Sequence, residues 1–126
     1  GWLDATINYL QIFEHLDDPI HTMNELHRVL APGGWAFVEV PSTDGRGAYQ
    51  DPTHVSYWNE NSFMYYTQRN QAAFIQPQYQ GRFQKSFLRT YFPSDWWREN
   101  HIPVVRADLI ALKPPYDERP PGEVLI

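Results

Sequence analysis

Two residues of this 126-residue chain, Asp51 and His54, have the types and the spacing needed to move a proton. They lie three positions apart in a stretch, residues 41–54, that is rich in Ser, Thr, Asp, Gly and Pro. Because an imidazole titrates near neutral pH, a neighbouring carboxylate and imidazole can share a proton and act in acid–base chemistry or in substrate contact. A structural interpretation, in which both side chains hydrogen-bond to their own loop, is also compatible with the sequence.

The other histidines considered for metal binding show no ligand pattern. His21, His27 and His101 have neither the i, i+4 spacing on one helix nor a nearby carboxylate pattern typical of metal ligands. His27 falls on the apolar face of a predicted helix, where a buried, hydrogen-bonded histidine is expected. The chain has no cysteine, which excludes disulfides, thiolate ligands and a cysteine nucleophile. We therefore predict no metal site.

A Gly-x-Gly sequence occurs in Asp44-Gly45-Arg46-Gly47-Ala48. It has no third glycine, and no apolar helix follows it directly. A dinucleotide-binding loop needs both features, because its glycines bring the backbone close to a pyrophosphate at a helix N-terminus. We interpret this segment as a flexible loop.

Composition narrows the class of protein. The chain has 10 Lys and Arg against 15 Asp and Glu, and the basic residues form no cluster, so direct binding to nucleic acid is not expected. No apolar run reaches the roughly 20 residues of a membrane-spanning helix, and the first residues do not resemble a signal peptide. A single cytoplasmic domain without membrane contact is expected, with 42% hydrophobic residues to build its core.

Residues 1–40 have the pattern of strand, helix, strand. Residues 4–13 form a short apolar run typical of a buried parallel strand. Asp17 or Asp18 is expected to cap the next helix, which ends at Pro32-Gly33-Gly34. Residues 35–40 then form the second strand. Two strands joined through a helix of this length make a right-handed unit with the strands parallel.

The second half of the chain has a different pattern. Asn59 is expected to cap a short helix over residues 60–68, and residues 94–97 suggest another short helix. Residues 104–112 have the character of a strand. Residues 82–92 alternate as a strand does, which would place three aromatic side chains on one face: Phe83, Phe87 and Tyr91. Since about ten residues without a crossover helix join these two strands, they should be antiparallel.

Three sequence motifs carry a resemblance to a known family. They are Phe13-Glu14-His15-Leu16-Asp17-Asp18-Pro19, Arg28-Val29-Leu30-Ala31-Pro32-Gly33-Gly34 and, more loosely, Asp51-Pro52-Thr53-His54 with Tyr57-Trp58. In order and spacing they resemble the class I, Rossmann-like S-adenosylmethionine-dependent methyltransferases. The resemblance implies an α/β fold that is the C-terminal half of the methyltransferase sheet, with parallel strands followed by an antiparallel pair and helices packed on the sheet.

The same resemblance implies a division of the chain into parts of one partial methyltransferase-like domain, residues 1–126. Residues 1–40 would be the strand-helix-strand unit and residues 41–80 a substrate-side loop and helix insertion. Residues 81–113 would form the antiparallel strand pair, and residues 114–126 a Pro-rich tail. From its composition, the segment over residues 113–121 should be extended and partly mobile. In the family, the glycine-rich cofactor loop and the ribose-binding acid lie upstream of these elements, so we expect this chain to lack them.

The resemblance also assigns roles to side chains. Four residues at the carboxyl end of the first strand would bind the cofactor, S-adenosylmethionine: Gln11, Phe13, Glu14 and His15. Open α/β sheets bind ligands at this end of their strands. In the alternative structural interpretation, Glu14 and His15 satisfy backbone groups and begin the following turn. Asp51 and His54 would be the catalytic candidates, and only weak cofactor binding, or none, is expected of this chain alone.

An aromatic group in the second half has two interpretations. It could form a cage for a planar or cationic methyl acceptor, although core packing is the more common role of such residues. The group consists of Trp58, Phe63, Tyr65, Tyr66, Phe74, Trp96 and Trp97.

Two functions from different classes remain open. The first is the acceptor-side half of an S-adenosylmethionine-dependent methyltransferase, inactive by itself and acting on an unidentified acceptor. The second is a non-catalytic, truncated methyltransferase-like module that acts in protein–protein interaction. In either case the first strand, residues 6–13, would present an unpaired hydrophobic edge. We expect that edge to form a homodimer or to pair with a missing N-terminal half.

Overall fold

The computed structural model describes residues 7–10 and 12–116. Its strands are β1 (Ile7–Leu10), β2 (Trp35–Pro41), β3 (Phe83–Tyr91) and β4 (Val104–Ala111). Its α-helices are α1 (Pro19–Val29), α2 (Gly47–Gln50), α3 (Glu60–Thr67), α4 (Arg69–Ala72) and α5 (Asp95–Glu99). Two single-turn 3-10 helices, η1 (Phe13–His15) and η2 (Ala73–Ile75), complete the described elements.

The four described strands form one sheet in the order β1-β2-β4-β3. β1 is parallel to β2, with Ile7 opposite Ala36 and Leu10 opposite Glu39. The α1 crossover between them makes this direction possible, because a parallel pair cannot be closed by a tight turn. β4 is antiparallel to both β2 and β3. The α/β class is therefore as predicted, and so is the antiparallel arrangement of the last two strands.

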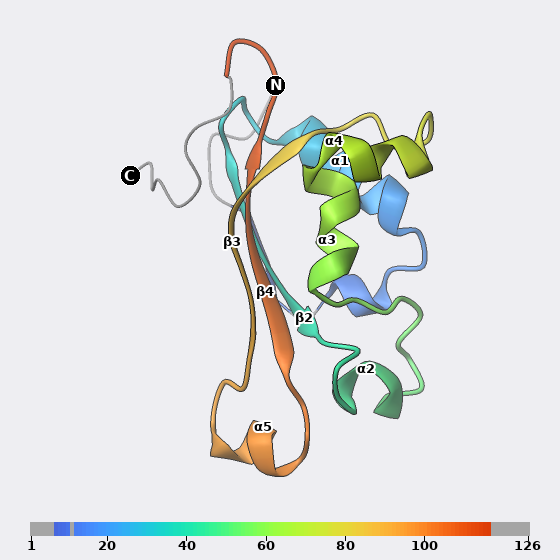
Figure 1. The fold of residues 1–126 in the computed structure, drawn as a ribbon, viewed down its shortest axis with the longest axis vertical. Coiled ribbons are helices and arrows are strands. Elements are labelled where there is room, and N and C mark those ends of the chain that lie inside the picture. The colour runs from blue at the N-terminus through green and yellow to red at the C-terminus, as the bar shows by residue number, and fades with distance from the viewer. Residues whose placement is uncertain (1–6, 11, 117–126) are drawn as a thin grey trace.

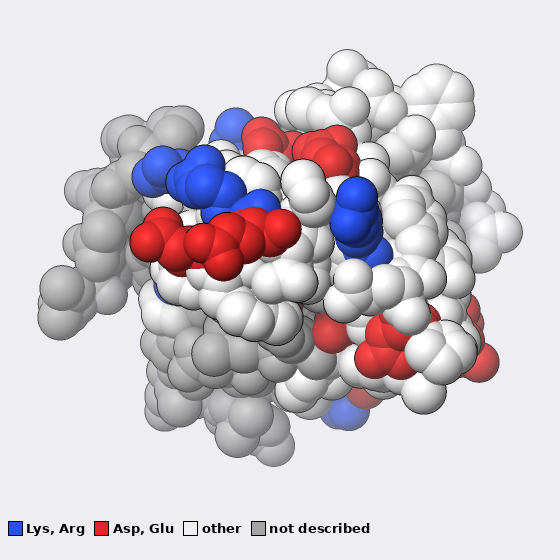
Figure 2. All heavy atoms as spheres, turned by 90° about the horizontal axis from the view of Figure 1, so that it is seen from below, with Lys and Arg blue, Asp and Glu red and all other residues white. Residues whose placement is uncertain are grey.

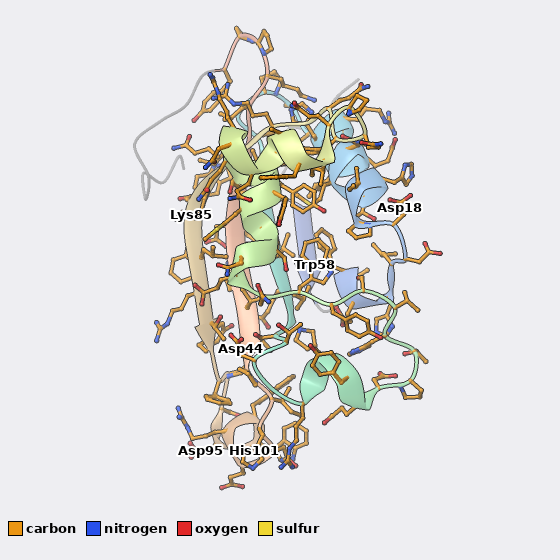
Figure 3. The ribbon with its side chains drawn as sticks, turned by 45° about the vertical axis from the view of Figure 1, so that its right-hand side comes forward. Asp18, Asp44, Trp58, Lys85, Asp95 and His101 are labelled. Carbon is orange, nitrogen blue, oxygen red and sulfur yellow. The ribbon has the colours of Figure 1, made fainter. Side chains whose placement is uncertain are left out.

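Helices α1, α3 and α4 lie on one face of the sheet (Figure 1). The core fills the space between these helices and alternate residues of the strands, as the period of two in a strand requires. Trp58 lies within this layer (Figure 3). The largest fully buried side chains include Phe13, Met23, Leu26, Leu30, Val38, Phe63, Phe83 and Leu109.

Helix α1 begins where its sequence signals predict, but it ends at Val29, before the predicted stop at Pro32-Gly33-Gly34. The cap, which the sequence leaves open between two aspartates, is Asp18: its carboxylate accepts from the backbone N–H of His21 at 3.0 Å. After the helix, Gly33 has a φ of 78°, and a Cβ there would lie 2.6 Å from the ring of Tyr116. The turn into β2 therefore requires glycine for both its conformation and its space.

His27 has the structural role predicted for it. Its Nε2 lies 2.9 Å from the carbonyl oxygen of Leu112, and it is partly buried. Burial lowers the pKa of His27, so its neutral form is favoured. The hydrogen bond therefore ties helix α1 to the end of β4.

The first strand does not extend to Phe13, where the predicted run over residues 4–13 ends. β1 ends at Leu10, and Phe13 already belongs to η1, where the N–H of His15 donates to the carbonyl of Ile12 at 2.9 Å. Residues 1–6 and residue 11 lie outside the described part. The chain turns at η1 because it must leave the sheet before α1 can cross back over it.

The prediction that Phe83 shares a face with Phe87 and Tyr91 is wrong because of a β-bulge. The register with β4 shifts between Lys85 and Phe87. An extra residue in one strand sends all later side chains to the opposite face. Phe83 is fully buried, whereas Phe87 is 42% exposed. Leu88 packs against the core in its place.

The loop that contains the Gly-x-Gly sequence packs closely against another part of the chain. Gly47 begins helix α2. A Cβ on Gly45 would lie 2.1 Å from Cδ of Pro103, and one on Gly47 would lie 2.5 Å from Cγ2 of Ile102. These glycines therefore allow the loop to lie directly against the segment that precedes β4.

The Pro-rich tail also begins differently from the predicted extended chain. The N–H of Tyr116 donates to the carbonyl of Lys113 at 2.8 Å, which closes a turn. Lys113 Nζ donates to the carbonyl of His27 at 2.7 Å and so satisfies the C-terminal end of α1. Residues 117–126 lie outside the described part.

The described surface has mixed charge on the face seen in Figure 2. Its described Lys and Arg side chains lie beside Asp and Glu side chains and form no continuous basic strip. Within residues 7–10 and 12–116, no helix has both the length and the apolar character that crossing a membrane requires.

Replacing Asn59 with alanine is expected to lower the free energy of unfolding by about 1–2 kcal/mol. Asn59 Oδ1 accepts from the N–H of Asn61 at 2.9 Å and caps α3, while Nδ2 donates to Thr43 Oγ1 at 2.9 Å. Urea denaturation followed by circular dichroism measures the loss. Asn61→Ala is the matched control, since its exposed side chain caps nothing. Equal losses in the two variants would contradict the capping role.

Candidate functional site

Two distant segments meet at the end of β1. The carbonyl of Glu14 accepts from the N–H groups of Val55 and Ser56, at 2.8 and 3.2 Å. Ser56 Oγ donates to the carbonyl of Phe13 at 2.7 Å and accepts from Trp58 Nε1 at 3.0 Å. These bonds fix residues 53–58, the loop after α2, beside η1.

The meeting of these segments creates a cluster of titratable side chains. One potential ligand atom from each of Glu14, His15 and His54 lies within 4.8 Å of the others. His15 Nε2 is 3.6 Å from Glu14 Oε1, and His54 Nε2 is 3.6 Å from Asp51 Oδ2. The two imidazole rings meet edge to face, with their centroids 4.8 Å apart. We call these four residues the Glu-His cluster.

The hydrogen bonds of the two histidines define their neutral tautomers. His54 Nδ1 lies 3.2 Å from the carbonyl oxygen of Ala48, which can only accept, so Nδ1 carries the proton. Thr53 Oγ1 donates to Asp51 Oδ1 at 2.7 Å and thus accepts from His15 Nδ1 at 3.2 Å. In both neutral rings Nε2 is therefore an unprotonated nitrogen directed at a carboxylate.

Glu14 is the most unusual member of the cluster. It is 3% exposed, and its Oε2 has no hydrogen-bond partner within the described residues. Burial raises the pKa of Glu14, an effect that its backbone hydrogen bond and the neighbouring histidines only partly oppose. In contrast, hydrogen bonds from the hydroxyl and N–H of Thr53 lower the pKa of Asp51. The cluster thus holds two carboxyl groups with opposite shifts.

The sequence candidates Asp51 and His54 come together as a pair, and their structural interpretation has support as well. Asp51 Oδ1 accepts from the N–H of Thr53 at 2.9 Å, which stabilises its own loop. His54 Nδ1 likewise forms a hydrogen bond within the loop region, to the carbonyl oxygen of Ala48. Both interpretations can hold at once, because each side chain keeps a second atom directed at the cluster.

The four residues assigned to the cofactor lie in different environments. Glu14 and His15 belong to the cluster, whereas Gln11 lies outside the described residues. The ring of Phe13 is 1% exposed and packs against Trp58, with centroids 5.3 Å apart. In this arrangement Phe13 supports the site from the core, and only its neighbours have functional atoms toward the cluster.

The sequence missed the position of Thr53 and the meeting of the two motifs. Thr53 links His15 to Asp51, although 38 positions separate it from His15. A signal existed, because the two motifs follow the ends of two strands predicted to be parallel. Carboxyl ends of neighbouring parallel strands meet at one edge of a sheet.

The aromatic group does not form a single cage. Trp58, Phe63 and Tyr66 pack in the core, with the Trp58 and Phe63 rings 5.1 Å apart. Phe74 is 77% exposed and Trp96 is 58% exposed, the latter on α5 at the far end of the β3–β4 hairpin (Figure 1). A groove of about 290 Å³ does lie over the core part, lined by Pro19, Ile20, Tyr57, Trp58, Ser62, Tyr65, Tyr66 and Ile75.

Comparison with known families adds one finding. A family model described as a methyltransferase domain matches residues 6–108. The matched range contains every member of the Glu-His cluster. No curated protein and no solved structure matches the chain.

The tautomers lead to a prediction that nuclear magnetic resonance can check. In the chelator-treated chain at a pH where imidazoles are neutral, the nitrogen shifts of His15 and His54 should report a proton on Nδ1. Thr53→Val should shift His15 toward the Nε2-protonated form and leave His54 unchanged, because only His15 depends on the Thr53 hydroxyl. Thr67→Val is a control outside the cluster. An unchanged His15 tautomer in Thr53→Val would contradict the hydrogen-bond assignment.

Proposed function

The chain belongs to the methyltransferase domain family, and we propose that it forms the acceptor side of an S-adenosylmethionine-dependent methyl-transfer site. The observation that carries the proposal is the Glu-His cluster. It combines two imidazole rings and two carboxyl groups at the carboxyl end of a parallel strand. Ligands of open α/β sheets bind at this position.

The sheet order supports a finer assignment within the family. Strands β1 and β2 have the direction and the crossover helix expected for the fourth and fifth strands of the methyltransferase sheet. Strands β3 and β4 have the antiparallel arrangement expected for the sixth and seventh. We assign the chain to the C-terminal half of that sheet, as one partial domain. The glycine-rich cofactor loop would then come from a longer native chain or from a partner.

The residues present offer a partial fit to the cofactor. The buried Oε2 of Glu14 has no partner and suits a ligand that donates a hydrogen bond, such as an ammonium or a hydroxyl group. Glu14 and His15 would contact the cofactor on this side, together with Gln11. When bound, S-adenosylmethionine supplies a methyl group on a sulfonium, and an acceptor can attack that methyl group directly.

The chain's own contribution is to orient the acceptor and to take its proton. His54 is suited to the second task, because its side chain is 7% exposed and its Nδ1–H is fixed on Ala48. Its Nε2 is free to accept a proton from an acceptor hydroxyl or amine. The carboxylate of Asp51, 3.6 Å from that nitrogen, would stabilise the imidazolium that forms.

If the chain forms only half of the methyltransferase sheet, its first strand needs another strand as a partner. Within the described residues, β1 pairs with β2 on one side only. Unpaired strand edges tend to pair with another strand. We propose that this edge binds either a second copy of the chain or an N-terminal methyltransferase half.

The catalytic part of the proposal is tested with His54 variants. The chain alone should give no low-micromolar isotherm with S-adenosylmethionine. Supplied with a glycine-rich cofactor-binding half, it should form S-adenosylhomocysteine from hydroxyl or amine acceptors. His54→Asn, which keeps a donor for Ala48 but no base, should lower turnover about 10²- to 10⁴-fold.

His21→Ala is the matched control, because it removes an exposed histidine that lies outside the cluster. The melting temperature of His54→Asn should stay close to that of the parent chain. Unchanged turnover with a large fall in melting temperature would assign His54 a structural role only.

The assembly proposal is tested by light scattering over a concentration series. A homodimer should show twice the 14.9 kDa mass of one chain. A mass of 14.9 kDa at every concentration would reject the homodimer and leave the N-terminal half as the partner of β1.

A further inference from the structure

We propose that Glu14, His15 and His54 bind a divalent first-row transition metal ion, with Asp51 beside it. The sequence predicts no metal site, because its histidines show no local ligand spacing. The fold changes this conclusion by bringing His54 to the Glu14-His15 pair, 39 positions from His15, with one ligand atom of each residue within 4.8 Å of the others. The side chains are those of the proposed methyl-transfer site, but metal binding does not require that activity.

The first argument is an excess of acceptors. In their neutral form both imidazoles carry the proton on Nδ1, so the two Nε2 atoms have lone pairs to offer. Each Nε2 lies 3.6 Å from a carboxylate oxygen, one from Glu14 and one from Asp51. Acceptor atoms that face one another without a donor repel unless a cation lies between them. A metal ion satisfies all of them at once.

The second argument is the unpartnered oxygen of Glu14. This residue is 3% exposed, and its Oε2 has no hydrogen-bond partner. A buried polar atom without a partner lowers stability. A cation bound by the Glu14 carboxylate would offset this cost.

The third argument is that both histidines already form a hydrogen bond through Nδ1, the ring nitrogen that would not bind the metal ion; we call these bonds their outer contacts. A metal-binding histidine almost always donates its second N–H to a carbonyl, a carboxylate or a similar acceptor. His54 donates to the carbonyl of Ala48, and His15 donates to Thr53, which in turn donates to Asp51. These bonds orient each ring with Nε2 toward the cluster.

The potential ligand atoms, which lie within 4.8 Å of one another, need to move only slightly closer together to bind one ion. Ligand bonds to zinc are about 2.0–2.2 Å, so bound ligand atoms lie roughly 3–4 Å apart. The side chains of His15 and Asp51 are 41% and 43% exposed, which leaves them free to adjust. Three protein ligands leave a position open for a water or for an oxygen of an acceptor.

The ligand types select the class of ion. Two imidazoles with one carboxylate suit Zn²⁺, Fe²⁺, Co²⁺ or Ni²⁺, whereas Mg²⁺ and Ca²⁺ prefer sites made of oxygen. With an ion bound, His54 Nε2 is a ligand and no longer a base. The ion would then lower the pKa of a bound hydroxyl group in its place.

The test is a titration of the folded 126-residue chain with Co²⁺, followed by its displacement with Zn²⁺. We expect one ion per chain and the visible absorption of low-coordinate Co²⁺, which Zn²⁺ abolishes. His15→Ala and His54→Ala should abolish that absorption, and Glu14→Gln should weaken binding. Thr53→Val should weaken binding about 10- to 100-fold, because it removes only an outer contact.

His21→Ala and His101→Ala are the controls, since both remove exposed histidines outside the cluster, and His101 lies at the far end of the β3–β4 hairpin (Figure 3). His15→Ala alters a partly exposed side chain, so circular dichroism should show that its fold is kept. Binding that survives His15→Ala and His54→Ala, or no stoichiometric binding at all, would overturn the proposal. The metal titration does not depend on methyl transfer, and the turnover assay does not depend on metal binding. Either proposal can therefore fail while the other is supported.

Discussion

The hydrogen bonds between the backbone at the end of β1 and the loop at residues 53–58 are the constraint on which the site depends. Glu14 contributes its carbonyl to two N–H groups of this loop, and Ser56 bridges the carbonyl of Phe13 to the indole of Trp58. Trp58 is itself held in the core by the rings of Phe13 and Phe63. The loop therefore cannot move away from η1 without disturbing the core. A rigid core thus determines which titratable side chains meet.

This rigidity helps to explain why a costly group persists at Glu14. A buried carboxyl group without a full set of partners lowers stability, and proteins retain such groups mostly at sites of binding or catalysis. No described side chain near Glu14 donates to its Oε2. The structure therefore has a local deficit of positive charge, which a proton, a metal ion or a cationic ligand can fill.

Patterns among neighbouring residues predicted most helices and strands, but they did not predict the Glu-His cluster. Asp18 and Asn59 cap their helices because capping depends on neighbouring residues alone. The face of the sheet on which Phe87 lies could not be predicted. The β-bulge depends on pairing with β4, and the alternation of polar and apolar residues in β3 does not reveal it. The contact between His15 and His54 is tertiary, so no local spacing can reveal it. Only the carboxyl ends of two strands predicted to be parallel suggested the proximity.

The direction of β1 links the question of assembly to that of catalysis. Two copies related by a twofold axis that pair through β1 would have these strands antiparallel. Their carboxyl ends, and with them the two Glu-His clusters, would then lie at opposite ends of the joint sheet. A homodimer of this kind cannot complete one cluster with residues from the strand end of the other. A strand parallel to β1 would bring its own carboxyl end beside Glu14, where a cofactor loop following it could reach the site. Pairing between two copies through β1 therefore favours the interaction module, and parallel pairing with a different half favours the enzyme.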